Sequence, residues 1–226
     1  MRLRTAWPLA LVLWAGHAVA QPAQEATVRA AGDTIVFDGQ INRRSAAEFL
    51  RLLQDPAVRR LVITSGGGMV TAALDMADAL FARGLDVEVP RACRSSCANY
   101  IVPAARRKLL RPGAVAWHGN MTHVLYLQQT GQASWSEELM EGARQLARRE
   151  RQFYQRVGVD GFVAWFGKVA PYNVDDFYTL SAPDMQRFGM GDITESADPP
   201  PDPQVPVLTV DWDGLPAIRP AVQLAP

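Results

Sequence analysis

Apolar residues occur along the chain either in short continuous runs or at positions three or four residues apart, and these two patterns predict its strands and helices. Short apolar runs bounded by turn residues are typical of buried parallel strands, and the chain has such runs at 34–37, 61–63, 87–89 and 114–117. Apolar positions three or four residues apart predict helices, and they occur over 45–54, 69–83 and 97–106. Strand, helix and strand in succession form repeated βαβ units, so the pattern predicts an α/β fold around a mostly parallel sheet.

The second half of the chain is more helical and more charged. A long helix is predicted over 134–157, with a charged face that is typical either of a solvated helix or of a protruding helix that forms oligomers. Shorter helices over 160–169 and 182–188 follow, with a last strand at 192–194. Prolines are frequent from residue 198 onward, so we expect an extended or disordered tail over 198–226.

The first twenty residues are typical of a secretory signal peptide. Arg2 and Arg4 precede an apolar stretch over 6–15 that is too short to span a bilayer, and 18–20 is an A-x-A cleavage sequence. Cleavage after residue 20 predicts a periplasmic or secreted protein; an uncleaved membrane anchor is the alternative. No later stretch has the roughly 20 apolar residues of a membrane-spanning helix, so we expect no stable membrane insertion after cleavage.

Length and charge narrow the number of domains and the kind of partner. Without residues 1–20 the chain has 206 residues, which is enough for one substantial core, so 21–197 is predicted to be a single α/β domain. Those 206 residues contain 21 basic and 23 acidic side chains, a net charge of −2. That balance does not indicate nucleic acid or an anionic surface as the main partner.

Three short segments at predicted strand ends carry candidate chemistry, and ligands of open α/β sheets bind at such ends. The glycine run 66–68 opens a helix, where backbone N–H groups can hold developing negative charge. Ser95 lies in a turn at the entry to the next helix, where a hydroxyl can project into a cleft. His118 ends the strand at 114–117, which returns the chain to the same sheet edge, as a general base for Ser95 requires.

Each of these segments also has an ordinary structural interpretation. The glycines are consistent with a plain tight turn, Ser95 with a helix N-cap, and His118 with a structural histidine. His123 is the other histidine left after signal cleavage, but it lies in a less defined segment and is the weaker candidate base. The combination of the three segments is therefore what favours chemistry.

Five motifs occur in order along the chain: Ser65-Gly66-Gly67-Gly68-Met69-Val70-Thr71-Ala72, Ser95-Ser96-Cys97-Ala98, Trp117-His118-Gly119, the long helix over 134–158, and Leu180-Ser181-Ala182-Pro183. Together they resemble the Clp protease proteolytic subunit and its relatives in the ClpP/crotonase superfamily, in particular exported ClpP-like proteins. The resemblance extends from about Ile35 to Thr194. It implies a ClpP/crotonase-like fold in which the long helix protrudes.

The resemblance also implies a catalytic triad. Ser95 would attack a peptide carbonyl, and His118 would accept its proton and pass it to the leaving amine. The third member in the family is an acid just before the Leu-Ser-Ala-Pro segment. Asp176 is the nearest acid, although it lies one residue too far upstream for an ungapped match, and Asp175 is the second choice.

Oxyanion donors and partners follow from the same resemblance. Gly67 and Ser96 would supply the N–H groups that bind the oxyanion, with Gly68 adjacent to them. Peptides or unfolded proteins would be the substrates, no cofactor or metal is implied, and the relatives form homo-oligomers. The expected function is that of an exported serine peptidase.

The chain departs from the family in the turn around Ser95. Cys93 and Cys97 have no counterpart in the Clp motif, Gly66 replaces a proline, and the spacing from Ser95 to His118 is about two residues shorter. In an oxidising compartment the two cysteines could form a disulfide that stiffens the turn. Two buried free thiols are the alternative.

Three other interpretations remain at this point. The chain could be a non-catalytic binding or assembly module that keeps a ClpP-like fold. The paired cysteines with His118 and His123 have spacings that loosely fit a zinc site, although a predicted helix and strand separate them. A Ser-Lys peptidase would need Lys108 or Lys168 as its base, and neither follows a clear strand end.

Overall fold

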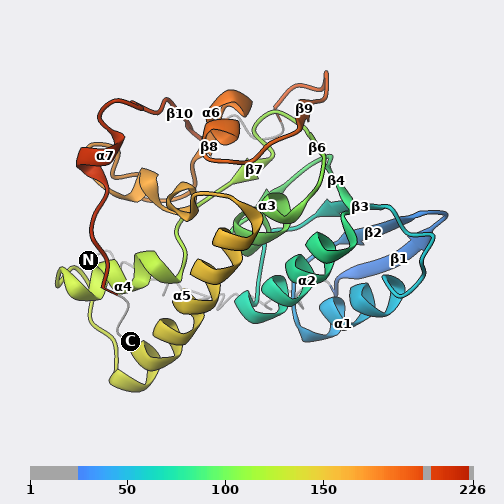
Figure 1. Cartoon of the computed structure of the whole chain (residues 1–226), viewed down its shortest axis with the longest axis horizontal. Helices are drawn as coiled ribbons and strands as arrows, with labels where there is room; N and C mark the ends of the chain where they lie inside the picture. The colour runs from blue at the N-terminus through green and yellow to red at the C-terminus, as the bar shows by residue number, and fades with distance from the viewer. Residues whose placement is uncertain (1–24, 201–204, 224–226) are drawn as a thin grey trace, which may run out of the picture.

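Five parallel strands and one antiparallel edge strand form the central sheet of the structure, a computed structural model that describes residues 25–200 and 205–223. The strands lie in the order β1 (Thr27–Ala31), β2 (Thr34–Asp38), β3 (Arg60–Thr64), β4 (Asp86–Val89), β6 (Lys108–Leu110) and β9 (Ile193–Glu195) (Figure 1). The predicted α/β fold with a mostly parallel sheet is confirmed. The predicted signal peptide at 1–20 lies outside the described residues.

Apolar side chains in register build the centre of the sheet. Ile35 pairs with Leu61, which pairs with Val87, and all three are almost completely buried. Helices cover this core. The α-helices of the described residues are α1 (Arg43–Leu52), α2 (Val70–Arg83), α3 (Val102–Ala104), α4 (Met121–Gln129), α5 (Glu137–Val157), α6 (Ala182–Arg187) and α7 (Leu215–Ile218).

Local signals define the helices that lead to the site. A capping box between Asn42 and Ser45 begins α1, since each side chain accepts the other residue's backbone N–H. Gly84, in the left-handed conformation at φ 62°, ends α2 as predicted. The helix predicted over 97–106 is instead a π-helical turn, Cys97–Ile101, followed by the short α3 that contains Pro103. Proline lacks an N–H and disfavours a regular helix interior, which accounts for the early end at Ala104.

Short strands outside the central sheet carry the candidate site. Strand β5 (Cys93–Arg94) pairs in parallel with β7 (Val115–Ala116), and β8 (Thr179–Leu180) pairs in parallel with β10 (Val207–Leu208). An antiparallel bridge between Trp117 and Tyr178 links the two pairs. The strand predicted at 114–117 was therefore wrongly placed in the central sheet. Strand β6 occupies that position, between β4 and β9. The apolar pattern did not show β6, because Lys108 leaves it only two apolar residues in succession, Leu109 and Leu110.

The long helix α5 lies against other helices along much of its length. It packs beside α4, and its second half approaches α2 (Figure 1). Arg149 forms ion pairs with Asp75 and Asp78 of α2, and Arg156 also pairs with Asp78. Part of the charged face that the sequence indicated as solvated or protruding thus joins α5 to α2. Within the described ranges, no helix combines the length and the apolar character needed to cross a membrane.

The prediction of a disordered tail over 198–226 is wrong for the described residues 205–223. This segment adds β10 to β8, places α7 against the domain, and runs back toward α4 (Figure 1). The Trp212 indole donates a 2.8 Å hydrogen bond to Asp184, and Arg219 pairs with Asp160. Proline content predicted extended backbone here, but buried Leu215 and half-buried Trp212 anchor that backbone to the core.

Candidate active site

Ser95 lies in a strained turn directly after β5. Its φ of 53° is in the left-handed region, which residues other than glycine rarely occupy. Two backbone hydrogen bonds hold it there: the Ser95 N–H donates to the Ala116 carbonyl at 3.1 Å, and the Asn99 N–H donates to the Ser95 carbonyl at 2.8 Å. The turn ends where the π-helical turn begins at Cys97, so the Ser95 side chain is presented at a helix entry.

His118 reaches Ser95 because their two strands are neighbours. Strands β5 and β7 run parallel with Arg94 opposite Ala116, so the residues that follow each strand emerge at the same end. The Nε2 atom of His118 lies 2.7 Å from the Oγ atom of Ser95. This is hydrogen-bond distance between a candidate nucleophile and a candidate base. The structure thus brings together the two residues that the sequence singled out.

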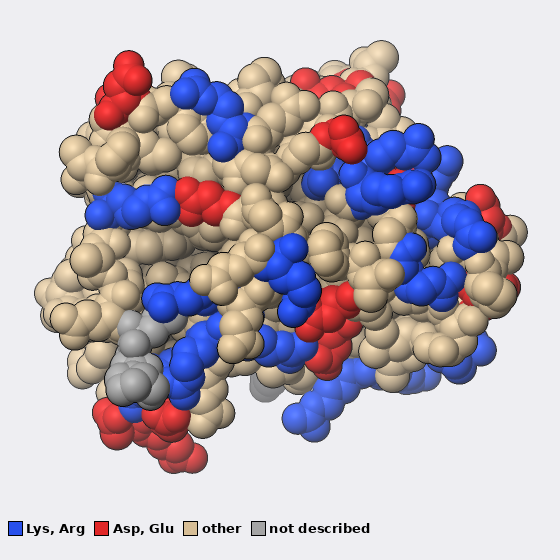
Figure 2. All heavy atoms as spheres, viewed as in Figure 1, with Lys and Arg blue, Asp and Glu red and all other residues tan. Residues whose placement is uncertain are grey.

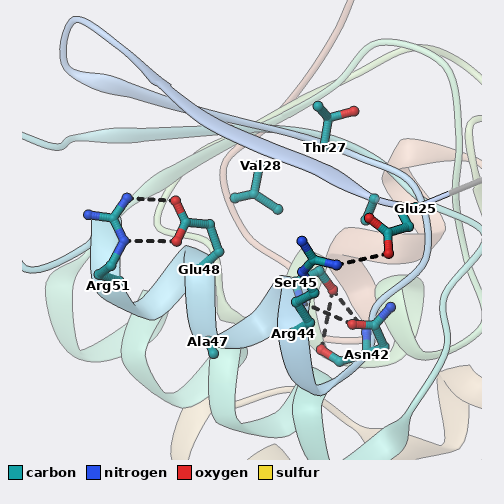
Figure 3. A pocket seen from close by; sticks show the side chains of 10 residues that line it. Glu25, Thr27, Val28, Asn42, Arg44, Ser45, Ala47, Glu48 and Arg51 are labelled. Carbon is teal, nitrogen blue, oxygen red and sulfur yellow. Dashed lines mark hydrogen bonds and ion pairs between the residues drawn. The ribbon is translucent and has the colours of Figure 1, made fainter.

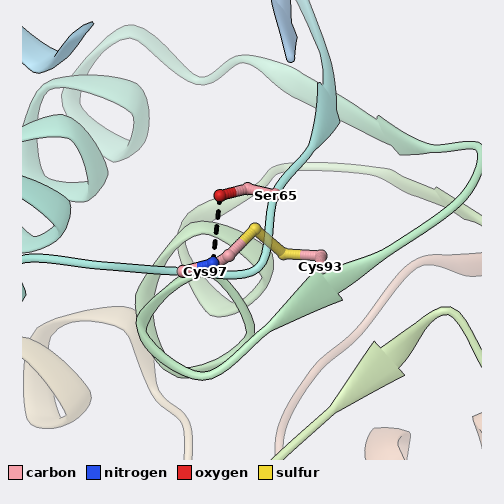
Figure 4. Close-up of a disulfide and its surroundings, with 4 residues drawn as sticks. Ser65, Cys93 and Cys97 are labelled. Atoms are coloured by element: carbon pink, nitrogen blue, oxygen red, sulfur yellow. Dashed lines mark hydrogen bonds between the residues drawn. A yellow bond between two sulfur atoms is a disulfide. The ribbon is translucent and has the colours of Figure 1, made fainter. Parts of the chain in front are cut away.

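A disulfide joins Cys93 to Cys97 across the Ser95 turn (Figure 4). Their Cα atoms are 5.2 Å apart, and both residues are fully buried. The disulfide leaves no thiolate in this turn to bind zinc, so the zinc interpretation does not hold for this state of the protein. Across the described part of the chain, no three His, Cys, Asp or Glu side chains gather into a group that could hold a metal ion.

The glycine turn after β3 packs directly on the Ser95 turn. Ser65 bridges to Cys93 in parallel, and its hydroxyl accepts the Gly67 N–H at 3.0 Å beside the disulfide (Figure 4). Gly67 has φ 93°, and a Cβ atom added to it would lie 2.7 Å from the Arg94 carbonyl oxygen and 2.8 Å from the Ser95 Cβ atom. Only glycine fits this contact.

The predicted oxyanion donors separate into two kinds. The Gly67 N–H is already committed to the Ser65 hydroxyl. The N–H groups of Gly68 and Ser96 take part in none of the turn, loop and cap hydrogen bonds of the described residues. Of the three predicted donors, Gly68 and Ser96 are therefore the two whose N–H groups stay available for a ligand.

Asp176 and Asp175 do not form the third member of a hydrogen-bonded triad in this structure. Within the described residues, neither carboxylate makes a hydrogen bond to His118. Instead the backbone carbonyls of both aspartates accept hydrogen bonds from Lys168, and both residues are exposed. The ring of Phe177 packs on the imidazole of His118, with the two ring centroids 4.5 Å apart.

The surroundings of His118 favour its neutral form. The residue is exposed as a whole, but its imidazole is partly shielded from water. This desolvation lowers the pKa of His118 below 6.5, and the positive charge of Lys168 lowers it further. The carboxylate of Asp176 acts in the opposite direction and raises the pKa of His118. A neutral imidazole at neutral pH is the form that can accept a proton from Ser95.

A cavity of about 240 Å³ opens beside Ser95 and His118. Its lining comes from three regions: Val70 of α2; four residues between 95 and 100; and six residues between 118 and 124, before and within the first turn of α4. His123 lines it too, and burial followed by the charges of Lys168 and His118 lowers the pKa of His123 to about 4. The sequence pattern missed α4 and, with it, the wall formed by Met121 and Val124. Their spacing of three residues was the available signal.

The lysines do not act as bases here. The Lys168 ammonium group donates to three backbone carbonyls, and that of Lys108 donates to the carbonyls of Ala105 and Gly191. Burial lowers the pKa of both lysines, that of Lys108 to about 8, but in the described residues the side-chain partner of the Ser95 hydroxyl is His118 and neither lysine. The Ser-Lys interpretation therefore has no support in the geometry.

A larger cavity of about 560 Å³ lies elsewhere, between β1 and α1 (Figure 3). Its charged side chains are paired with each other: Arg44 with Glu25 at 2.8 Å, and Arg51 with Glu48 at 2.6 Å. No serine, histidine and acid converge in it. The smaller cavity beside Ser95 is thus the better candidate for chemistry.

On the face seen in Figure 2, surface charge does not point to another site. Figure 2 shows basic side chains gathered over the region of β4 and β6, with acidic ones among them. Arg106 and Arg107 both pair with Asp86 there and lower its pKa to about 2. Much of this positive charge is therefore already balanced.

No family model matches the chain, and no curated protein is detectably similar to it in sequence.

Proposed function

We propose that this protein is an exported serine hydrolase of the ClpP/crotonase type that cleaves peptides or unfolded proteins. The observation that carries the proposal is the 2.7 Å contact between Ser95 Oγ and His118 Nε2 at the edge of a cavity. The mostly parallel sheet and the order of the motifs support it. Because fold alone does not define function, the argument rests on the site.

The proposed reaction assigns one role to each group. The Ser95 oxygen attacks the peptide carbonyl carbon while His118 Nε2 accepts the hydroxyl proton. The N–H groups of Gly68 and Ser96 stabilise the oxyanion that forms. His118 then protonates the leaving amine, and the same imidazole activates a water molecule that hydrolyses the acyl-enzyme and restores Ser95.

A non-catalytic module with the same fold is the second candidate function. The observation that favours it is the lack of a carboxylate hydrogen bond to His118 within the described residues. A triad without its acid is strongly impaired in known serine hydrolases. Such a module would bind peptide in the same cavity without cleaving it.

Labelling with a fluorophosphonate probe separates the two functions. We expect the wild-type protein to be labelled at Ser95, as mapped by mass spectrometry, and Ser95→Ala to lose labelling and turnover by a factor on the order of 10⁶. Ser196→Ala, outside the site, is the matched control. Folded wild-type protein that resists labelling would contradict the hydrolase proposal and support the binding module.

Export and assembly are separate parts of the proposal. A signal peptide cleaved after residue 20 predicts Gln21 as the first residue of the exported protein, which N-terminal sequencing of the periplasmic or secreted fraction checks. The resemblance further predicts a homo-oligomer. Analytical ultracentrifugation would show this as a mass several times that of the monomer, and a monomer at all concentrations would contradict it.

A further inference from the structure

His118 has a defined partner on only one of its two sides. Its Nε2 atom contacts Ser95, but no described carboxylate accepts a hydrogen bond from the ring. In serine hydrolases the third group holds the imidazole in one orientation. Here the ring of Phe177 packs on the imidazole, with the two centroids 4.5 Å apart and the ring planes tilted by 36°.

Lys168 holds the segment that carries Phe177. Its ammonium group donates to the carbonyls of Val174, Asp175 and Asp176 at 2.9, 3.0 and 2.7 Å. All three donors of the ammonium group are used on consecutive residues. A further backbone bond of 2.8 Å joins the Val174 N–H to the Gly167 carbonyl next to Lys168. The segment 174–176 is thus clamped to one side chain, and Phe177 follows it directly.

We propose that Lys168 is the positioning residue of the catalytic base: its ammonium group clamps 174–176 and so sets Asp176 and Phe177 against the His118 imidazole. This inference rests on the proposed hydrolase function. It gives the lysine the orienting role that a hydrogen-bonded carboxylate has in other serine hydrolases. It also gives the site a cation near the base, which regulates how readily that base is protonated.

The charged groups around His118 determine whether the loss of Lys168 raises or lowers the pKa of the imidazole. Lys168 and His123 are the basic groups near the ring, Asp176 is the nearby acid, and the Arg94 guanidinium lies 5.7 Å from the centre of the Phe177 ring. The positive charge of Lys168 opposes protonation of His118 more than Asp176 favours it. Removing that charge, or letting water reach the ring, therefore raises the pKa of His118.

Two variants separate the clamp from the charge. Lys168→Gln keeps hydrogen-bond donors but loses the charge, and Lys168→Met loses both. Lys108→Met is the matched control, because Lys108 likewise donates to backbone carbonyls but lies on β6, outside the residues that line the cavity. The measurements are the rate of fluorophosphonate labelling at pH 7 and the titration of His118 by NMR in a Ser95→Ala background.

We expect Lys168→Met to slow labelling about 10–100-fold, because small misplacements of a base have effects of this size. Both Lys168 variants should move the His118 titration midpoint to higher pH, while Lys108→Met leaves rate and midpoint unchanged. A purely structural role would slow labelling in Lys168→Met but leave the midpoint of Lys168→Gln, which keeps hydrogen-bond donors, unchanged. Should Lys168→Met not fold, as judged by circular dichroism, the midpoint shift in Lys168→Gln decides the question.

The outcomes distinguish this inference from the proposed function. If the wild-type protein is labelled but both variants match it in rate and midpoint, the role of Lys168 is wrong and the hydrolase proposal stands. If the wild-type protein is not labelled and the midpoint still shifts, Lys168 controls His118 in a protein that is not a hydrolase. A midpoint that moves to lower pH would overturn the electrostatic part of the inference.

Discussion

A Cβ atom added to Gly67 would lie 2.8 Å from the Cβ atom of Ser95. Real Cβ atoms essentially never come so close, so the glycine turn and the Ser95 turn touch with no space between them. The same contact brings the backbone of Gly67 within reach of Ser96, whose N is 3.0 Å from that added atom. Position 67 therefore sets how closely the glycine turn, which carries the proposed donor Gly68, approaches the proposed nucleophile Ser95.

Gly67→Ala should disrupt the site while its neighbour tolerates the same change. We expect about 1–3 kcal/mol loss in free energy of unfolding, because φ 93° and the Ser95 contact both oppose a side chain. Fluorophosphonate labelling should fall on the order of 100-fold. Gly66→Ala is the control, since an added Cβ there meets nothing within 4 Å. Equal behaviour of the two variants would argue against a packed double turn.

The disulfide should be needed for fast labelling of Ser95. Two thiols need more room than one S–S bond, and Cys93 and Cys97 are fully buried around the strained turn. We expect Cys93→Ala/Cys97→Ala to lose about 2 kcal/mol of unfolding free energy, as the closure of such a short loop implies. Labelling should slow as well, in this variant and in wild-type protein reduced under mild denaturation and returned to buffer with dithiothreitol. An unchanged labelling rate in both would show that hydrogen bonds alone hold Ser95.

The pH dependence of labelling should report a neutral base. Burial and Lys168 lower the pKa of His118 below 6.5, so labelling should be constant near pH 7 and fall only as the pH drops through a midpoint below 6.5. The measurement is the labelling rate between about pH 3 and pH 8.5, a range that includes the expected midpoints of both histidines. His123→Gln tests the assignment, because burial lowers the pKa of His123 to about 4 and a midpoint that depends on His123 would lie near that value.

Glu150 should make the fold less stable as the pH rises. It is fully buried in α5, where it accepts hydrogen bonds from Tyr100 and from the Met121 N–H at 3.2 Å, and burial raises its pKa from 4.5 to about 7. The protonated form is favoured on folding, so its stabilisation is complete below pH 4.5 and is lost as the pH rises to about 7.

Glu150→Gln should remove that pH dependence. Between pH 4.5 and 7.5 we expect the wild-type protein to lose on the order of 2–3 kcal/mol of unfolding free energy relative to Glu150→Gln, as measured by urea denaturation. Glu141→Gln, exposed on the same helix, should follow the wild-type curve. Parallel curves for the wild-type protein and Glu150→Gln would mean that Glu150 titrates normally.

The C-terminal segment should contribute to stability through Trp212. Its indole donates to Asp184, packs on Phe188 with centroids 4.8 Å apart, and lies under the Arg187 guanidinium. We expect Trp212→Ala to lower the free energy of unfolding by about 2–3 kcal/mol, as for a large, partly buried aromatic side chain. Trp135→Ala, at an exposed position, should change it by less than about 0.5 kcal/mol. Similar losses for both would contradict the docked segment.

The sequence by itself determined the elements with strong local signals. The apolar run at 61–63 became β3, and the helical spacing before Gly84 became α2 with a left-handed end. Ser95 could be singled out by its turn at a helix entry and His118 by its place after a short apolar strand, while for the two cysteines a disulfide and two free thiols both stayed open. Such signals depend on neighbours within a few residues, which the sequence contains.

Only the tertiary structure decided which distant segments meet. The segment 108–110 has a weaker apolar pattern than 114–117, yet long-range pairing assigns the first to the central sheet and pairs Val115–Ala116 of the second with β5. The contacts of Lys168 also could not be predicted from the sequence, because its partners are backbone carbonyls, which every residue has. Hydrogen bonds to backbone, and the packing of Trp212 on Phe188, leave no local pattern, because they depend on how the folded chain returns on itself.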